Sequence, residues 1–333
     1  MKANQNLLPS DKKRKRIIKT KLKTNPKYGK KPDERETKEL LNNGLINLDK
    51  PCGPTSHQVD AWLKDIFKND KVGHSGTLDP NATGVLPIAI GDATKALHAL
   101  LSAGKEYIGI MKLHKQVDEK KIITTCKKFI GSISQVPPVR SAVKRVKRKR
   151  HIYYLDVIEI KEREVLFRVG CESGTYIRTL CVDIGKKLNC KAHLEELRRT
   201  RVGNLSEEKS YNLQDIKDSY YFWKENYSSE SIRSVVMPME NITAHLPKIV
   251  VRDSAVDALC HGANLALPGV TEVDSDIKKG EMIAILTLKG EIVALATTTM
   301  ITEDIIDKDK GVCAKLERVL MKKGTYPSIW KKS

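Results

Sequence analysis

The segment Gly73-His74-Ser75-Gly76-Thr77-Leu78-Asp79-Pro80 contains the residue with the clearest potential for chemistry. Its two glycines and closing proline disfavour a helix and the interior of a strand, so the segment predicts a shaped loop. Asp79 has no charged neighbour there, as expected of a partly buried carboxylate on a rigid turn. Such a carboxylate can act as a nucleophile or a base. Taken alone, an Asp that only caps the next segment is the simpler interpretation.

Positive charge is concentrated in two stretches of the 333-residue chain, whose formal net charge is +19. Residues 2–31 hold twelve Lys and Arg against one acid, Asp11, and the run 144–150 holds six more. Localised charge of this kind favours a polyanion, most often a nucleic acid, over a general solubility effect, which would spread the charge evenly. The length allows two domains with cores of their own.

The seven cysteines are odd in number and form no Cys-x-x-Cys pair. Most stand in apolar stretches such as 122–130 and 179–184, which favours buried thiols in a reducing compartment over disulfides or a zinc site. No run approaches the roughly eighteen apolar residues of a membrane span, and residues 1–10 lack the apolar core of a signal peptide. We therefore expect a soluble intracellular protein with no membrane partner.

The elements that position the loop follow from apolar spacing. A one-faced helix is predicted over 56–67, where apolar residues recur at helical spacing after the candidate caps Thr55 and Ser56. The other predictions for this half are strands at 45–48, 105–114, 152–160 and 165–171, an apolar run at 85–90, and helices at 93–101, 122–130, 175–188 and 192–199. Strands and helices mix without a strict βαβ rhythm, which predicts an α+β fold with a mixed, largely antiparallel sheet.

Composition divides the chain into four parts. Residues 1–36 are polar, basic and broken by prolines, and predict a disordered or loosely wrapped arm. Residues 37–205 carry the elements above, and residues 206–245 are expected to form a connector that packs on them. Residues 246–330 alternate short β-like runs with glycine turns and predict a small β-barrel-like domain. The sequence contains no glycine-rich phosphate loop, so nucleotide hydrolysis is not expected.

Several motifs, in the same order, resemble the TruB-type family of tRNA T-loop pseudouridine synthases. The resemblance is greater to its archaeal and eukaryotic guide-RNA branch, whose human member is dyskerin. The motifs of the first half are 47–51, 53–56, 73–80 and 84–87, and those that support the branch are 104–107, 137–145, 173–178 and 196–201. The C-terminal part, with its motifs at 253–256, 267–270 and 325–327, resembles the RNA-binding PUA domain.

The resemblance implies an enzyme that isomerises uridine to pseudouridine in RNA, and it makes Asp79 the catalytic aspartate. The base is detached from its sugar and rejoined through carbon five, so no atoms are gained or lost and neither a cofactor nor a metal is implied. A carboxylate suits this chemistry because it can attack, or stabilise charge at, an electron-poor carbon and then leave again. The sequence leaves open whether the sugar or the base is attacked.

Two further residues gain roles from the same resemblance. Tyr107 matches a tyrosine that stacks on the target base and can move a proton, whereas without the motif it is best interpreted as a core tyrosine. Arg178 matches an arginine that pairs with the catalytic carboxylate and orients it, whereas without the motif it is an exposed helix residue.

Four more residues match positions around the family's pocket. Tyr176, Lys50 and Leu197 match residues that line it, although Lys50 can equally be a support of the fold. His74 matches a histidine of the loop that meets the RNA as the target base leaves its stack, a step that costs a few kcal/mol.

The basic runs are candidate phosphate contacts. In the second run the candidates are Arg140, Lys144, Arg145, Lys147 and Arg148, with a merely solvated face as the alternative. The run 12–16 has the composition of a nuclear localisation signal, but in an archaeal-like chain an arm that grips RNA is favoured.

The leading hypothesis is the catalytic subunit of a box H/ACA guide ribonucleoprotein that acts on rRNA or on the T-loop uridine of tRNA. Its partners would be a guide RNA and the three small proteins of the family's complex. The alternatives are a stand-alone tRNA pseudouridine synthase and a catalytically idle RNA-binding scaffold, which would not need Asp79, Tyr107 and Arg178 together. A ribosomal or DNA-binding protein is nearly excluded by the motifs. The chain lacks the long Lys-rich tail of eukaryotic members, so we expect an archaeal, cytoplasmic protein; a eukaryotic one would be nucleolar.

Overall fold

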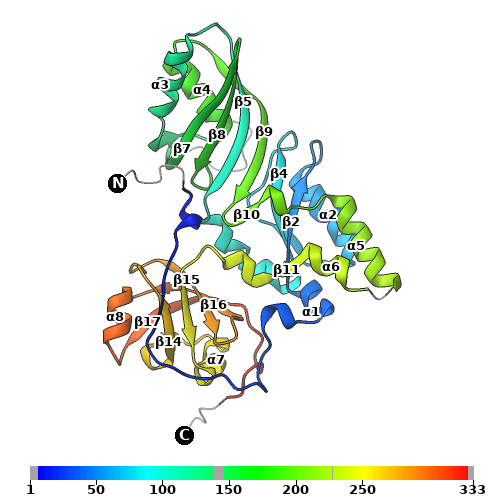
Figure 1. Cartoon of the computed structure of the whole chain (residues 1–333), viewed down its shortest axis with the longest axis vertical. Coiled ribbons are helices and arrows are strands. Elements are labelled where there is room, and N and C mark those ends of the chain that lie inside the picture. The colour runs from blue at the N-terminus through cyan, green and yellow to red at the C-terminus, as the bar shows by residue number, and fades with distance from the viewer. Residues whose placement is uncertain (1–6, 138–145, 227, 329–333) are drawn as a thin grey trace.

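The computed structural model describes residues 7–137, 146–226 and 228–328, which form two separate β-sheets (Figure 1). The larger sheet has ten strands. Its path runs β11 (Val236–Pro238), β2 (Gly44–Lys50), β4 (Thr83–Ile90), β9 (Ala192–Val202), β5 (Lys105–Leu113), β8 (Glu164–Cys171), β7 (Arg148–Lys161) and β6 (Gly131–Gln135), with β3 (Val72–His74) on β4 and β10 (Leu205–Ser206) on β9. Among its described pairs only β4 and β9 run parallel, which confirms the predicted α+β fold with a largely antiparallel sheet.

Most helices of this half form close to where apolar spacing predicts them. Helix α2 (Ser56–Phe67) begins at a capping box between Thr55 and Gln58 and buries Val59 and Leu63. The other helices are α1 (Thr37–Asn42), the 3₁₀ helix η3 (Gly91–Leu101), α3 (Glu119–Lys127) and α4 (Ile177–Lys187). The segment 93–101 is therefore helical, as predicted, but wound as a 3₁₀ helix.

The prediction of a helix over 192–199 is wrong. These residues belong to β9, which pairs with β5 on one side and with β4 on the other. The segment is rich in Leu, Glu and Arg, which favour a helix, but its place between two strands overrides that local preference. As a strand, the segment alternates its side chains, so that Arg199 is buried while the side chain of Arg198 stays 38% exposed.

Residues 207–243 fold back onto the ten-stranded sheet. They form η4 (Glu207–Lys209), α5 (Leu213–Asn226), α6 (Glu230–Val235), β11 and η5 (Met239–Thr243). Ile216 and Ile232 are fully buried in the same apolar cluster as Ile46 and Leu48 of β2. This shared core attaches the segment to the sheet.

The smaller sheet makes up most of the C-terminal part of the molecule, at the lower left of Figure 1. Its strand order is β1 (Arg16–Ile18), β14 (Val270–Asp274), β12 (Lys248–Val251), β15 (Met282–Thr287), β16 (Ile292–Thr298), β17 (Val312–Val319) and β13 (Leu265–Ala266), and it is accompanied by α7 (Asp253–Cys260), η6 (Leu267–Gly269) and α8 (Thr302–Asp307). Ile249, Ile283, Ile285 and Val293 are fully buried in its core. The predicted small β-rich domain is therefore present.

Of the two alternatives predicted for the arm, the wrapped arm is the one observed for residues 7–36, and disorder is wrong there; residues 1–6 lie outside the described part of the chain. The arm, dark blue in Figure 1, follows the C-terminal sheet and adds β1 to its edge beside β14. It also contains η1 (Pro9–Asp11) and η2 (Pro32–Glu34). Arg14 and Arg16 form ion pairs with Glu281 and Asp274 of the C-terminal part. Carboxylates far away in the sequence thus neutralise part of the arm's charge. The composition of the arm alone gives no sign of these partners.

Gly84 marks the point where β2, β4 and β9 meet, and it offers a test of this close packing. Its φ is +99°, and a Cβ there would lie 2.2 Å from the carbonyl oxygen of Arg199. Gly53 has a similar φ of +110° but open space around it. We expect Gly84→Ala to lower the melting temperature by roughly 4 °C or more beyond Gly53→Ala, because overpacking adds about 1–3 kcal/mol to the shared backbone strain. Equal melting temperatures of the two variants would contradict this account.

Candidate active site

Asp79 lies on the loop between β3 and β4 and forms an ion pair with Arg178 of α4. Asp79 Oδ2 is 3.0 Å from Arg178 Nη2, so the contact that the resemblance implied is present. The two side chains are 55% and 44% exposed, which overturns the expectation of a partly buried carboxylate. Leu78 turns into the core while Asp79 points outward. A carboxylate that is oriented by a guanidinium and still open to solvent can meet a large substrate.

Lys50 fastens the backbone that carries Asp79. Its buried ammonium, at the end of β2, donates hydrogen bonds to the carbonyl oxygens of Pro51 (2.8 Å), Pro80 (3.1 Å) and Ala82 (2.9 Å). Burial lowers the pKa of Lys50, and the nearby charge of Asp79 partly opposes this effect. All three donors of the ammonium are used, so Lys50 joins the end of β2 to the turn that directly follows Asp79.

The first half of the loop is fastened by two serines. Ser56, the first residue of α2, accepts a hydrogen bond from the Leu78 N–H (3.0 Å) and donates one to the Leu78 carbonyl (3.1 Å). Ser75 donates its hydroxyl to the carbonyl of Leu97 (3.2 Å) and its N–H to that of Pro87 (3.1 Å). Contacts to α2, β4 and η3 therefore fix the loop's shape in the free protein.

Tyr107 of β5 is the second candidate group, and it is both a core residue and a neighbour of the ion pair. It is 8% exposed, and it lies beside the buried guanidinium of Arg199, with which it is paired across β5 and β9. Arg199 also donates from Nε to the carbonyl of Val85 at 2.7 Å. Burial raises the pKa of Tyr107, Arg199 lowers it, and the charge of Asp79 is close enough to raise it further. The phenol thus lies within electrostatic reach of the carboxylate.

Two buried cations, Lys105 and Arg199, lie next to the loop. A Cβ added at Gly76 would meet Lys105 Cε at 3.0 Å and Arg199 Nη1 at 3.5 Å. Lys105 donates to Ser173 Oγ at 2.8 Å, and its burial together with Arg199 lowers the pKa of Lys105 to about 8. Neither cation forms an ion pair with a described residue, so together they make the region of the loop favourable for an anion. Sequence reasoning missed both residues, since a helix over 192–199 gives no reason to bury Arg199.

The start of α4 is held by a buried amide. Gln135, 3% exposed, donates from Nε2 to the Tyr176 carbonyl (3.1 Å) and accepts from the Tyr176 N–H (3.0 Å). Tyr176 is the N-cap residue of α4, and Arg178 follows two positions later. Gln135 therefore positions the turn from which Arg178 reaches Asp79, a role that no sequence signal indicated.

The remaining pocket candidates have different surroundings. Leu197 is partly buried and packs against the apolar cluster that contains Leu78 and Tyr107. His74 turns toward α2, and its side chain is only 7% exposed. Its Nδ1 lies 2.7 Å from Asp60 Oδ2, and its Nε2 lies 3.0 Å from Thr77 Oγ1.

Two of the candidate phosphate contacts can be placed. Lys147 is exposed and Arg148 is half-buried at the start of β7, whereas Arg140, Lys144 and Arg145 lie outside the described residues.

Four family models match successive parts of the chain. They are the N-terminal domain of the TruB family pseudouridylate synthases (residues 64–177), the C-terminal domain of tRNA pseudouridylate synthase B (178–244), the PUA domain (247–320) and the DKCLD domain (5–60). Among the described residues, no helix has the length and apolar character needed to cross a membrane.

Similar proteins match over almost their whole length. The probable tRNA pseudouridine synthase B of Methanopyrus kandleri is 54% identical, with 97% of this chain and 96% of the relative covered. The protein of the same name from Pyrococcus abyssi is 50% identical, with 97% of this chain and 98% of the relative covered. A solved Cbf5-Nop10-Gar1 complex contains a chain that is 49% identical, with a TM-score of 0.93 and coverage of 97% and 99%. A solved H/ACA RNP bound to a substrate RNA contains one that is 47% identical, with a TM-score of 0.91 and coverage of 98% and 100%. The chain therefore belongs to the TruB family of pseudouridine synthases, in the dyskerin-like branch with a C-terminal PUA domain.

Proposed function

We propose that this chain isomerises uridine to pseudouridine in RNA, as the catalytic subunit of an archaeal, cytoplasmic box H/ACA guide ribonucleoprotein. The observation that carries the proposal is the Asp79–Arg178 ion pair on a loop whose backbone is fastened from several sides. Preorganised groups of this kind are what an enzyme needs in order to act on a reacting carbon.

The reaction can be written with these residues alone. The bond between N1 of the base and C1′ of the ribose breaks, the base turns, and C5 forms the new bond to C1′. The C5 proton is released and N1 gains a proton, so atoms and charge balance without a cofactor. Asp79 would attack C1′ of the sugar or the base itself, and Arg178 would hold it in line. Tyr107 would pack against the base or transfer a proton, and the electrostatic influence of Asp79 on its phenol supports this role.

Guide dependence is supported by the full-length likeness to chains solved in Cbf5-Nop10-Gar1 and H/ACA RNP complexes. The runner-up is a stand-alone enzyme for tRNA, which the names of the closely similar archaeal proteins favour. The two hypotheses involve the same chemistry and differ in how the target uridine is chosen.

Tritium release from RNA labelled at C5 of uridine distinguishes the guide-dependent enzyme from the stand-alone enzyme. The purified chain is assayed on tRNA alone, and then with guide RNA and the small partner proteins. We expect fast release only in the complete assembly, at the uridine that the guide selects. Release by the chain alone, confined to the T-loop, would favour the stand-alone enzyme.

Asp79→Asn tests the assignment of the reacting group. The change removes the charge but little volume, so we expect tritium release to fall at least ~10³-fold while RNA affinity stays within a few-fold. Asp156→Asn is the matched control, because Asp156 Oδ2 also lies 2.9 Å from an arginine, Arg168, in a partly exposed pair on β7 and β8. A rate for Asp79→Asn close to that of the control would rule out Asp79 as the reacting group.

A further inference from the structure

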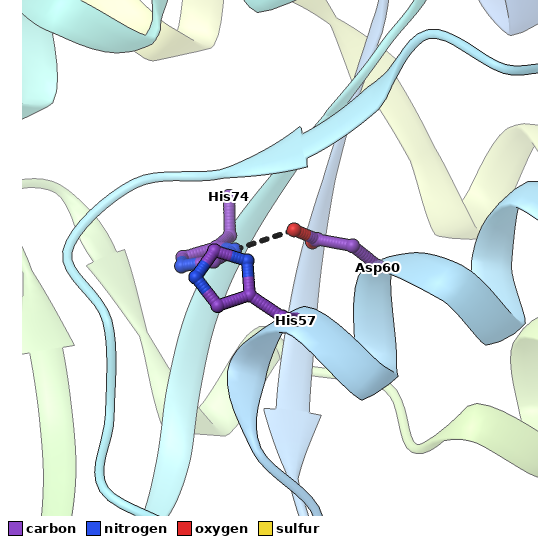
Figure 2. Close-up of side chains that lie close together, drawn as sticks. All are labelled: His57, Asp60 and His74. Carbon is purple, nitrogen blue, oxygen red and sulfur yellow. Dashed lines mark hydrogen bonds and ion pairs between the residues drawn. The ribbon is translucent and has the colours of Figure 1, made fainter.

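Three side chains beside the loop bring potential metal ligands together. His57 and Asp60 stand three residues apart on the first turns of α2, and His74 ends β3. Figure 2 shows the His57 ring and the Asp60 carboxylate both turned toward the His74 ring. The donor atoms of the three residues all lie within 4.8 Å of one another. Within the described residues this is the one group of three or more such side chains at that spacing.

The Asp60 carboxylate is only half satisfied by the protein. Asp60 is 8% exposed, and its Oδ2 lies 2.7 Å from His74 Nδ1. Its Oδ1 is buried and has no hydrogen-bond partner. A buried acceptor without a donor is costly, and a bound cation is one way to satisfy it.

His74 has outer support that suits a ligand. In the metal-free protein Nδ1 donates its proton to Asp60 Oδ2, and Nε2 lies 3.0 Å from Thr77 Oγ1. When an ion replaces the Nδ1 proton, an Nε2–H can donate to that hydroxyl. Metal-bound histidines commonly donate their second N–H in this way, which fixes the tautomer and the ring orientation. The His57 ring lies 5.1 Å from the His74 ring, at an interplanar angle of 68°.

We propose that His57, Asp60 and His74 form a binding site for a divalent transition-metal ion, with Zn²⁺ as the best match. Two imidazoles and one carboxylate are a ligand set that Zn²⁺ accepts, with a fourth position left for water. Ligand atoms about 2.0–2.2 Å from a tetrahedral ion lie roughly 3.3 Å apart. The short contact between Asp60 and His74 therefore opens by about half an ångström, the proton that His74 Nδ1 donates to Asp60 is released, and His57 moves closer. The site does not rest on the proposed function, although a bound ion would hold the loop of Asp79 against α2.

The test uses the full-length chain after treatment with a chelator, followed by titration with Co²⁺ and with Zn²⁺. Co²⁺ binding is monitored by its visible absorption and Zn²⁺ binding by calorimetry. We expect one equivalent to bind, with the intense absorption of a four- or five-coordinate Co²⁺ site. His57→Ala and Asp60→Asn are each expected to weaken binding at least ~10-fold. His57 is exposed, so its variant is expected to fold even if Asp60→Asn does not.

A second histidine pair supplies the matched control. His114 Nε2 and His193 Nδ1 lie 2.9 Å apart at an exposed position, without a neighbouring carboxylate in a metal-binding group among the described residues. His193→Ala is expected to leave the affinity unchanged. The proposal is overturned if no equivalent binds, if the affinity is unchanged in His57→Ala, or if binding is lost in His193→Ala.

Discussion

The candidate site depends on the buried ammonium of Lys50, which forms no ion pair with a described residue and donates its three hydrogen bonds to backbone carbonyls. Pro51 follows the end of β2, and Pro80 and Ala82 follow Asp79, so a single side chain joins β2 to the turn beside Asp79. Such a cation is stable in the interior only because every donor is satisfied. The exposed ion pair between Asp79 and Arg178 would be worth little on a mobile loop, and it gains its orientation from this hidden support.

The packing of β4 against β9 determines where the buried residues beside the loop lie. Gly84 lets β9 pass within backbone contact of β4, and this approach allows Arg199 to enter the core next to Tyr107. Lys105 joins Arg199 beside the loop. Two positive charges therefore lie in the interior next to the loop that carries Asp79, where solvent screens them poorly.

The sequence predicted the chemistry-bearing loop, its partner Arg178 and the mixed fold, because motif residues and apolar spacing are local signals. It failed where a residue's state depends on distant partners. Leu, Glu and Arg propensities favoured a helix over 192–199, and only the flanking strands make it β9. Likewise, the arm is ordered by carboxylates such as Asp274, and the amide of Gln135 holds α4 without any local signal. The exposure of Asp79 also could not be inferred from its apolar neighbours.

The most direct test of this account is the single-turnover rate of Lys50→Met in the complete guide assembly, measured beside RNA affinity and the melting temperature. The methionine fills the buried space but donates no hydrogen bond, so the loop loses its fastening while the exposed residues are unchanged. We predict a rate at least ~10²-fold lower, with RNA affinity within a few-fold and a folded protein at the assay temperature. A folded Lys50→Met protein that reacts at the rate of the wild-type chain would contradict the claim that Lys50 positions Asp79.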